Sequence, residues 1–157
     1  MRKILLSLAA LLTAGVAWAQ TEVRDIDPTK YYTLQCKATD HSGFIAEVNN
    51  EIKGRESKPT LLVFEAGETA GTYYIKSQAS SKYINSNASF SDVTFDVDKK
   101  TLWTKTELSG NLAFSASNGK YLNNNETGDG VNGLKVAGGT GGCSQWTLRE
   151  YVQPEIV

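Results

Sequence analysis

The sequence SGFIA at residues 42–46 returns as SKYIN at residues 81–85 and as GKYLN at residues 119–123. In each copy a polar turn leads into an aromatic residue and then a branched aliphatic residue. Each copy also follows a run in which apolar and polar residues alternate, as they do in half-buried β-strands. These runs are YYTLQCKAT (31–39), YYIKSQAS (73–80) and NLAFSAS (111–117). The sequence therefore predicts a strand, a turn and a second strand three times.

Further landmarks extend each copy to a unit of about 40 residues. Each first strand carries an aliphatic residue with an alanine four positions later, in the pairs Leu34/Ala38, Ile75/Ala79 and Leu112/Ala116. Each unit ends near a large aromatic residue, and these are Phe64, Trp103 and Trp146, spaced by 39 and 43 residues. A further strand is predicted at residues 93–97 and 134–136, and somewhere within 51–60 in the first unit. We interpret this self-similarity as an internal repeat.

One unit of this kind cannot cover its own apolar face. Three units arranged about an axis close a barrel and remove the exposed sheet edges, with the three aromatic rings in its centre. A solenoid of such repeats needs polar caps, which the sequence does not show, and a three-bladed propeller is disfavoured. No stretch keeps the helical period, so we expect little helix. The prediction is one all-β domain over residues 31–152.

The first 19 residues have the features of a secretory signal peptide. Arg2 and Lys3 are basic, residues 4–16 are mainly apolar, and Ala17-Trp18-Ala19 supplies the small residues that signal peptidase requires. The apolar part is too short to span a bilayer, so no membrane insertion is predicted. We predict a signal peptide at 1–19 and a leader at 20–30, in a protein that is secreted, or periplasmic in a Gram-negative bacterium.

Charge and metal-ligand content narrow the choice of partners. The whole chain has a net charge of −1, and it becomes −3 when Arg2 and Lys3 leave with the signal peptide. This balance does not favour nucleic acid or an anionic membrane surface, whereas a neutral glycan fits. One histidine and two widely spaced cysteines do not make a zinc site, so we predict neither a metal nor a cofactor.

Cys36 and Cys143 are the two cysteines of the chain. Export permits a disulfide to persist, and a bridge over so long a loop would contribute about 3–4 kcal/mol by restricting the unfolded state. The alternative is two separate buried thiols.

These residues resemble the ricin-type β-trefoil family, whose units carry a hairpin of the form G-K-C-L-D-V and end in Q-x-W. SKYIN and GKYLN match the hairpin with tyrosine in place of cysteine, and Thr101-Leu102-Trp103 and Ser144-Gln145-Trp146 match the ending. The resemblance covers about residues 30–152 and implies a β-trefoil of three four-stranded units. It also implies that the first and last strands are neighbours, and we therefore predict a Cys36–Cys143 disulfide.

In sugar-binding members of that family, the hairpin aspartate accepts hydrogen bonds from sugar hydroxyls. The matching positions here are Ala46, Asn85 and Asn123. Ala46 has no side-chain acceptor, so the first pocket is predicted to be inactive unless Glu47 substitutes, whereas the amides can donate and accept. Phe90 is a candidate for the stacking ring. The predicted ligand-binding residues are Asn85, Asn87, Asn123 and Asn125. The alternative for each asparagine is turn chemistry, because asparagine bonds its own backbone.

Other polar clusters are predicted to be structural. Asp92, Asp96 and Asp98 lack the spacing of a calcium loop and alternate with apolar residues, which indicates a solvated strand face. His41 lies in a turn beside Asp40, where consecutive side chains diverge, so we predict no catalytic residue.

We therefore predict a carbohydrate-binding, lectin-like module without catalytic activity, whose weak pockets gain avidity by repetition. The alternative is a trefoil that binds another secreted protein, such as a protease inhibitor or a surface-assembly component. That partner would contact an exposed loop at residues 49–58 or 126–133. A domain without any ligand is a third option.

Overall fold

The computed structural model describes residues 19–125 and 133–152, which form thirteen β-strands and one short 3-10 helix, so the all-β prediction is confirmed. The strands are β1 (Ala19–Val23), β2 (Tyr31–Cys36), β3 (Phe44–Val48), β4 (Glu51–Glu56), β5 (Leu62–Ala66), β6 (Thr72–Ser77), β7 (Tyr83–Ser86), β8 (Val93–Asp96), β9 (Trp103–Leu108), β10 (Asn111–Ser115), β11 (Tyr121–Asn123), β12 (Lys135–Ala137) and β13 (Trp146–Val152). The 3-10 helix η1 spans Gly142–Ser144. In this part of the chain, no helix is long and apolar enough to cross a membrane.

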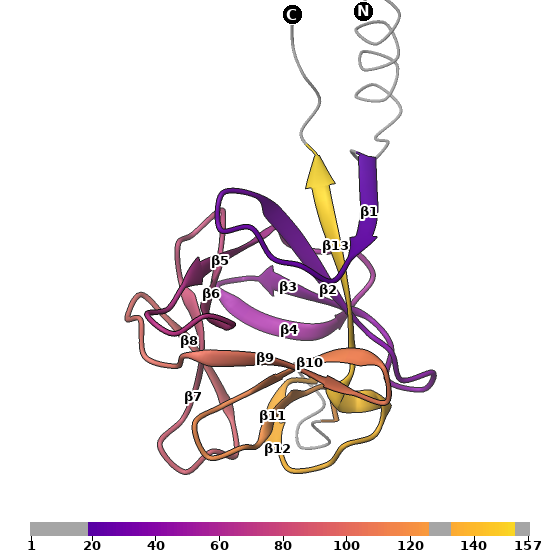
Figure 1. The fold of residues 1–157 in the computed structure, drawn as a ribbon, viewed down its shortest axis with the longest axis vertical. Coiled ribbons are helices and arrows are strands. Elements are labelled where there is room, and N and C mark those ends of the chain that lie inside the picture. Colours follow the sequence, from indigo (N-terminus) through magenta and orange to yellow (C-terminus); the bar gives the residue numbers. More distant parts are fainter. Residues whose placement is uncertain (1–18, 126–132, 153–157) are drawn as a thin grey trace, which may run out of the picture.

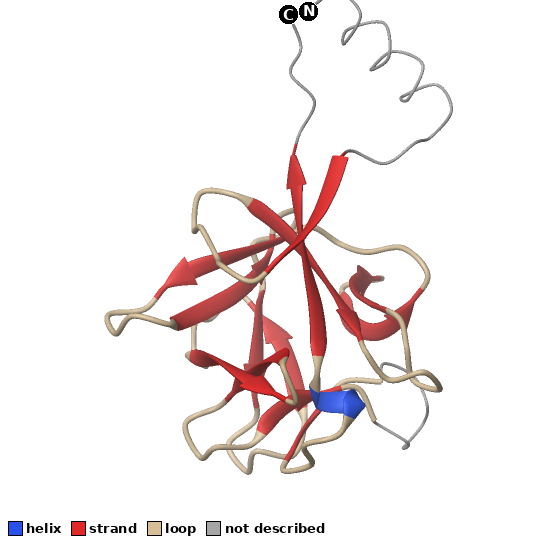
Figure 2. Cartoon of the chain, turned by 45° about the vertical axis from the view of Figure 1, so that its right-hand side comes forward, coloured by secondary structure: helices blue, strands red, loops and turns tan. Residues whose placement is uncertain are grey.

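Six of the strands close into a barrel (Figures 1 and 2). Strands β2, β5, β6, β9, β10 and β13 form a ring of antiparallel pairs that returns from β13 to β2. The other strands after β1 form the hairpins β3–β4, β7–β8 and β11–β12, and the first strand of each hairpin also pairs with the first barrel strand of its unit. Because the ring is closed, the barrel avoids the free edges of a flat sheet.

The chain passes through the same arrangement three times. Each unit contributes a barrel strand, a hairpin and a second barrel strand: β2 to β5, β6 to β9, and β10 to β13. Equivalent residues can be read from the pairing of each first barrel strand with its hairpin, in the pairs Gln35/Phe44, Lys76/Tyr83 and Ser115/Tyr121. The predicted repeat is therefore present as three equivalent sets of strands.

The third unit corrects the sequence alignment by two residues. The hairpin pairings make Leu34 and Ile75 equivalent to Phe114, not to Leu112 as the sequence suggested. The turn of the third unit is one residue shorter than that of the second, and no local pattern reveals the difference. A shift of two positions keeps a side chain on the same face of a strand, so Leu112 is also buried, with 3 % of its surface exposed.

The aromatic residues near the unit ends share one core but not one position. Phe64, Trp103 and Trp146 are all buried in the same hydrophobic cluster. The pairings of Tyr32 with Leu62 and of Tyr73 with Trp103 show that Leu62, not Phe64, is the equivalent of the two tryptophans. Phe64 instead packs 5.6 Å from the ring of Tyr32, edge to face.

In the first unit, a backbone N–H takes the place of the indole N–H that leucine lacks. The indole N–H of Trp103 donates to the Ile84 carbonyl at 2.9 Å, and that of Trp146 donates to the Leu122 carbonyl at 3.0 Å. Leucine has no such donor, and the equivalent carbonyl of Ile45 accepts the Thr60 N–H instead. Each buried carbonyl is thereby satisfied, as buried backbone groups must be.

The predicted leader contains a strand that the sequence analysis did not find. Strand β1 pairs with β13 from Ala19/Val152 to Val23/Leu148, as seen at the top of Figure 1. Beyond it, Arg24 forms an ion pair of 2.8 Å with Glu107. This segment has little apolar periodicity of its own, because its order depends on a strand more than a hundred residues away. The predicted signal peptide lies outside the described residues, apart from Ala19.

The predicted disulfide between Cys36 and Cys143 is not formed, and both residues are free thiols. The first and last strands are neighbours, since β2 pairs with β13. However, the Cys36 sulfur faces the backbone of η1 and donates to the Gly142 carbonyl at 3.4 Å. Burial raises the pKa of the Cys36 thiol, which keeps it protonated. Of the alternative, two separate buried thiols, the structure shows two thiols, with Cys36 buried and Cys143 only partly buried.

Candidate functional site

A pocket of about 530 Å³ lies beside the β7–β8 hairpin of the second unit. Its lining combines three apolar side chains with hydroxyl, amide and charged groups. The lining residues are Ser86, Asn87, Ala88, Phe90, Thr94, Asp96, Lys100, Thr101, Leu102 and Ser117. Among the predicted site residues, only Asn87 and Phe90 belong to this lining.

The tip of the hairpin shapes one wall of the pocket. The Asn87 side-chain oxygen accepts the backbone N–H groups of Ser91 and Asp92 at 2.9 and 3.1 Å. Asn87 therefore performs the turn chemistry that was the alternative to ligand binding. Within this turn Phe90 has a φ of 55°, in the left-handed region that bulky residues rarely adopt. The turn holds the Phe90 ring at the pocket, where it is also packed against the core.

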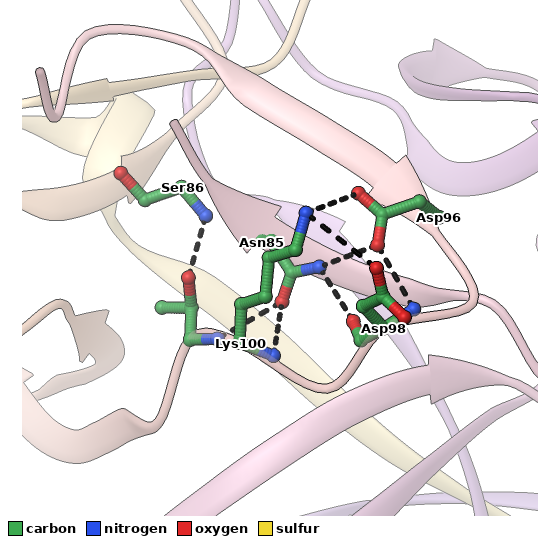
Figure 3. Close-up of polar contacts among 6 residues, drawn as sticks. Asn85, Ser86, Asp96, Asp98 and Lys100 are labelled. Atoms are coloured by element: carbon green, nitrogen blue, oxygen red, sulfur yellow. Dashed lines mark hydrogen bonds and ion pairs between the residues drawn. The ribbon is translucent and has the colours of Figure 1, made fainter. Parts of the chain in front are cut away.

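Asn85 lies beneath the pocket with no exposed surface. Its amide nitrogen donates to the Asp98 carbonyl at 2.9 Å and to Asp96 Oδ1 at 3.4 Å. Its oxygen accepts the N–H groups of Lys100 and Thr101 at 3.2 and 2.9 Å. Figure 3 shows Asn85 between Asp96 and the loop that carries Asp98 and Lys100. The amide has thereby filled both of its donor positions and both of its acceptor positions.

Three charged residues lie around Asn85, namely Asp96, Asp98 and Lys100. Lys100 Nζ lies 3.4 Å from Asp96 Oδ2 and 3.9 Å from Asp98 Oδ2. Asp96 and Lys100 line the pocket and Asp98 does not, so the formal charges of the lining cancel. The hydroxyls of Thr94 and Ser117 make no hydrogen bond with any other described residue. These hydroxyls, with Asp96 and Lys100, are the polar groups available at the pocket.

The third unit places its predicted asparagines differently. Asn123 is 5 % exposed, donates to Ser144 Oγ at 2.8 Å and accepts the Asn125 N–H at 2.8 Å. Asn125 is exposed, and residues 126–132, which include most of the loop considered for a protein partner, lie outside the described residues. The pairings Tyr83/Asp96 and Tyr121/Ala137 show that alanine occupies the equivalent of the acidic position.

The first unit has an acidic residue, Glu56, at the position of Asp96, but it lacks the counterparts of Asn85 and Phe90. Ala46 occupies the position of Asn85, and the hairpin turn consists of Asn49 and Asn50, without an aromatic residue. Glu47, considered as a substitute for the missing acceptor, receives a hydrogen bond of 2.7 Å from Ser77 Oγ. The other loop considered for a protein partner, 49–58, forms this turn and strand β4.

Sequence reasoning missed most of the lining. Asp96 was assigned to a solvated strand face, and Thr94, Lys100 and Ser117 were not considered as site residues. One signal was present, since Thr94 pairs with Asn85 in the β7–β8 ladder and the period of two then places Asp96 on the same face. Ser117 comes from a different unit, and only the closed barrel brings it to this pocket.

Comparisons with known proteins show the fold alone. No family model and no curated protein matches the chain. A solved GH43 β-1,3-galactosidase is similar over 83 % of this chain and 29 % of its own, with a TM-score of 0.63 and 17 % identity. Cry35Ab1 is similar over 84 % of this chain and 38 % of its own, with a TM-score of 0.53 and 17 % identity. The chain thus spans well under half of each of these proteins, and the class that they support is an all-β domain with a closed barrel.

Proposed function

We propose that this chain is an exported carbohydrate-binding module with a β-trefoil fold and no catalytic activity, and that its ligand occupies the pocket of the second unit. The observation that carries the proposal is the presence of the Phe90 ring, the Thr94 hydroxyl and the Asp96–Lys100 pair around one pocket of about 530 Å³. A β-trefoil is supported by three units that share a six-stranded barrel and each add one hairpin.

The pocket has the chemistry that a sugar ring requires. A pyranose presents a flat face of C–H groups, which packs on an aromatic ring, and a rim of hydroxyls, which both donate and accept hydrogen bonds. Phe90 offers the ring, and Asp96, Lys100 and Thr94 offer the acceptors and donors. Small-molecule sites typically combine apolar surface with placed polar groups, as this pocket does.

The charge of the pocket favours a neutral glycan. The lining contains one carboxylate, Asp96, and one ammonium, Lys100, whose formal charges cancel, so it presents no net positive charge to a uronic acid or a sulfated sugar. The net charge of the chain, −1 over all residues, points the same way. Likeness to a β-1,3-galactosidase chain, of which this fold spans 29 %, is compatible with a module that accompanies glycan chemistry.

Binding without catalysis is supported by what lines the pocket. Glycoside hydrolysis generally uses two carboxyl groups that flank the scissile bond, whereas the lining contains one carboxylate, Asp96, and neither histidine nor cysteine. The N-terminal sequence supports export, because its basic, apolar and small-residue segments follow the order of a signal peptide.

A glycan array of neutral oligosaccharides, followed by titration calorimetry, tests the proposal. We expect dissociation constants of about 0.1–1 mM, corresponding to about −4 to −5.5 kcal/mol, for so small a site. Asp96→Asn should weaken binding about tenfold, since hydrogen bonds to a charged group contribute about 1.5–3 kcal/mol. Glu56→Gln is the matched control, because Glu56 pairs with Phe44 as Asp96 pairs with Tyr83.

The proposal fails if the folded protein retains no glycan on the array. It also fails at this site if Asp96→Asn and Glu56→Gln have equal effects on affinity, since the bound sugar would then not contact Asp96.

A further inference from the structure

The pocket continues across the boundary between two units. Nine of its lining residues lie between Ser86 and Leu102 in the second unit, but Ser117 belongs to the turn that follows β10 in the third unit. This turn is held by its own backbone, since the Ala116 N–H donates to the Lys120 carbonyl and the Gly119 N–H to the Ala116 carbonyl. Ser117 is exposed, and the hydrogen bonds of its turn fix its position in the wall of the pocket.

The two parts of the pocket each present an unused hydroxyl. Thr94 is on β8, beside Asp96, and its hydroxyl has no partner among the described residues. The Ser117 hydroxyl is equally without a partner in the described chain. By contrast, the Ser86 hydroxyl donates to the Asn87 carbonyl, and the Thr101 hydroxyl accepts the Ser86 N–H. Both units thus contribute a group that is ready to bind a ligand.

The size of the pocket exceeds what one sugar requires. Its volume of about 530 Å³ falls within the range of about 300–1,000 Å³ that is typical of sites for drug-sized ligands. A single hexose is smaller than such ligands. A hexose that packs on Phe90 and bonds to Asp96 would leave the part of the pocket at Ser117 to water.

We infer that the ligand is an oligosaccharide of at least two sugar residues, one bound at Phe90 and Asp96 and the next reaching Ser117 in the neighbouring unit. This inference rests on the proposed function and adds to it the length of the glycan. The second sugar would gain the Ser117 hydroxyl as a hydrogen-bond partner and would exclude water from that side of the pocket.

Titration calorimetry with three neutral series tests the inference: galactose, glucose and xylose, each with its β-linked disaccharide and trisaccharide. For the series that binds, the disaccharide should bind about tenfold more tightly than the monosaccharide, which corresponds to one or two net hydrogen bonds. Ser117→Trp should remove most of this gain by filling the second part of the pocket, and should leave the monosaccharide affinity within about twofold. Ser42→Trp is the matched control, because Ser42 is an exposed serine in the corresponding turn of the first unit.

Equal affinities for the monosaccharide and the disaccharide would overturn the inference while leaving the proposed function intact. So would a disaccharide gain that survives in Ser117→Trp. If no member of any series binds and the glycan array is also blank, the proposed function falls and the inference falls with it.

Discussion

The hairpins of the first and second units have the same place in the fold and very different surfaces. Both hold the backbone in the same way: the Glu47 N–H donates to Thr60 Oγ1 at 2.8 Å, and the equivalent Ser86 N–H donates to Thr101 Oγ1 at 2.7 Å. The first hairpin has a two-residue turn, Asn49 and Asn50. The second has a longer turn that carries Phe90.

The comparison shows which hairpin positions pack in the barrel core and which positions differ near the pocket. Ile45 and Ile84 occupy the same position and are both fully buried, so the core side of the hairpin is shared. The opposite side has Ala46 in one unit and Asn85 in the other. The barrel closes with either residue, so this position does not determine the barrel. Asn85 bonds to the loop at residues 97–101, whereas Ala46 has no side-chain group that could bond to a loop. We propose that, among the described hairpins, the second one holds the glycan pocket, in place of the repeated pockets that the sequence suggested.

The largest expected effect comes from giving the second hairpin the residue of the first. Asn85→Ala removes four hydrogen bonds from a fully buried amide and leaves the Lys100 and Thr101 N–H groups without their acceptor. We expect the free energy of unfolding to fall by about 2–4 kcal/mol, measured by urea denaturation. Asn123→Ala should cost less, because Asn123 makes two such bonds. A smaller loss for Asn85→Ala than for Asn123→Ala would contradict the comparison.

A second substitution separates stability from binding at the tip of the hairpin. Phe90→Gly should weaken glycan binding about tenfold or more, because the stacking surface is lost. Its unfolding free energy should change by less than about 1 kcal/mol, since relief of the strained φ of 55° offsets the lost packing. Calorimetry and denaturation measure the two quantities. Asn49→Gly, at a φ of 52° in the first hairpin, is the control and should leave binding unchanged. Unaltered binding in Phe90→Gly would remove Phe90 from the site.

The smallest expected effect tests whether the first unit supports the pocket loop of the second. Glu65 on β5 binds Lys76 at 2.8 Å and Lys99, next to Lys100, at 3.5 Å. Partial burial opposes ionisation of Glu65, but its hydrogen bonds from Lys76 and Tyr83 outweigh burial, so its pKa lies below the ordinary value. A carboxylate with a lowered pKa stabilises the fold above its unfolded pKa, and this contribution is lost as the pH falls through the folded pKa.

Glu65→Gln should therefore cost less than about 1 kcal/mol of unfolding free energy at pH 7, because the group is partly exposed. The difference from the wild type should close as the pH falls below the ordinary range of glutamate. Thermal unfolding across pH 3–7 measures it, with Glu107→Gln as a control for an exposed ion pair. A difference that persists unchanged at the acid end would show that the charge of Glu65 is not its source.

Much of the fold was predictable from local patterns, and the errors have a common form. Alternation predicted the barrel strands and the hairpins because the side chains of a strand point to opposite faces. It placed the third unit two residues out of register and chose Phe64 over Leu62, since a shift of two leaves the pattern unchanged. The strand in the leader was missed because Thr21 and Glu22 carry no apolar signal, although they pair with Glu150 and Arg149.

The candidate site was less predictable than the fold. The hairpin match led to Asn85 and Asn123, but both amides are buried and bonded within the chain. The side chain of Asn85 bonds to the loop at residues 97–101. The hairpin motif does not reveal this loop, so it could not show whether Asn85 faces a ligand. Phe90 was recognised as a candidate ring, whereas Ser117 has no local feature that distinguishes it from other turn serines.

The sequence by itself determined that the chain forms short strands in three similar units with little helix, because alternation and turn residues act between near neighbours. Only the tertiary structure decided which asparagines are buried, that the cysteines remain thiols, and that residues of two units meet at one pocket. Those outcomes depend on groups brought together by barrel closure, and a residue's burial is set by neighbours that lie far from it in the chain.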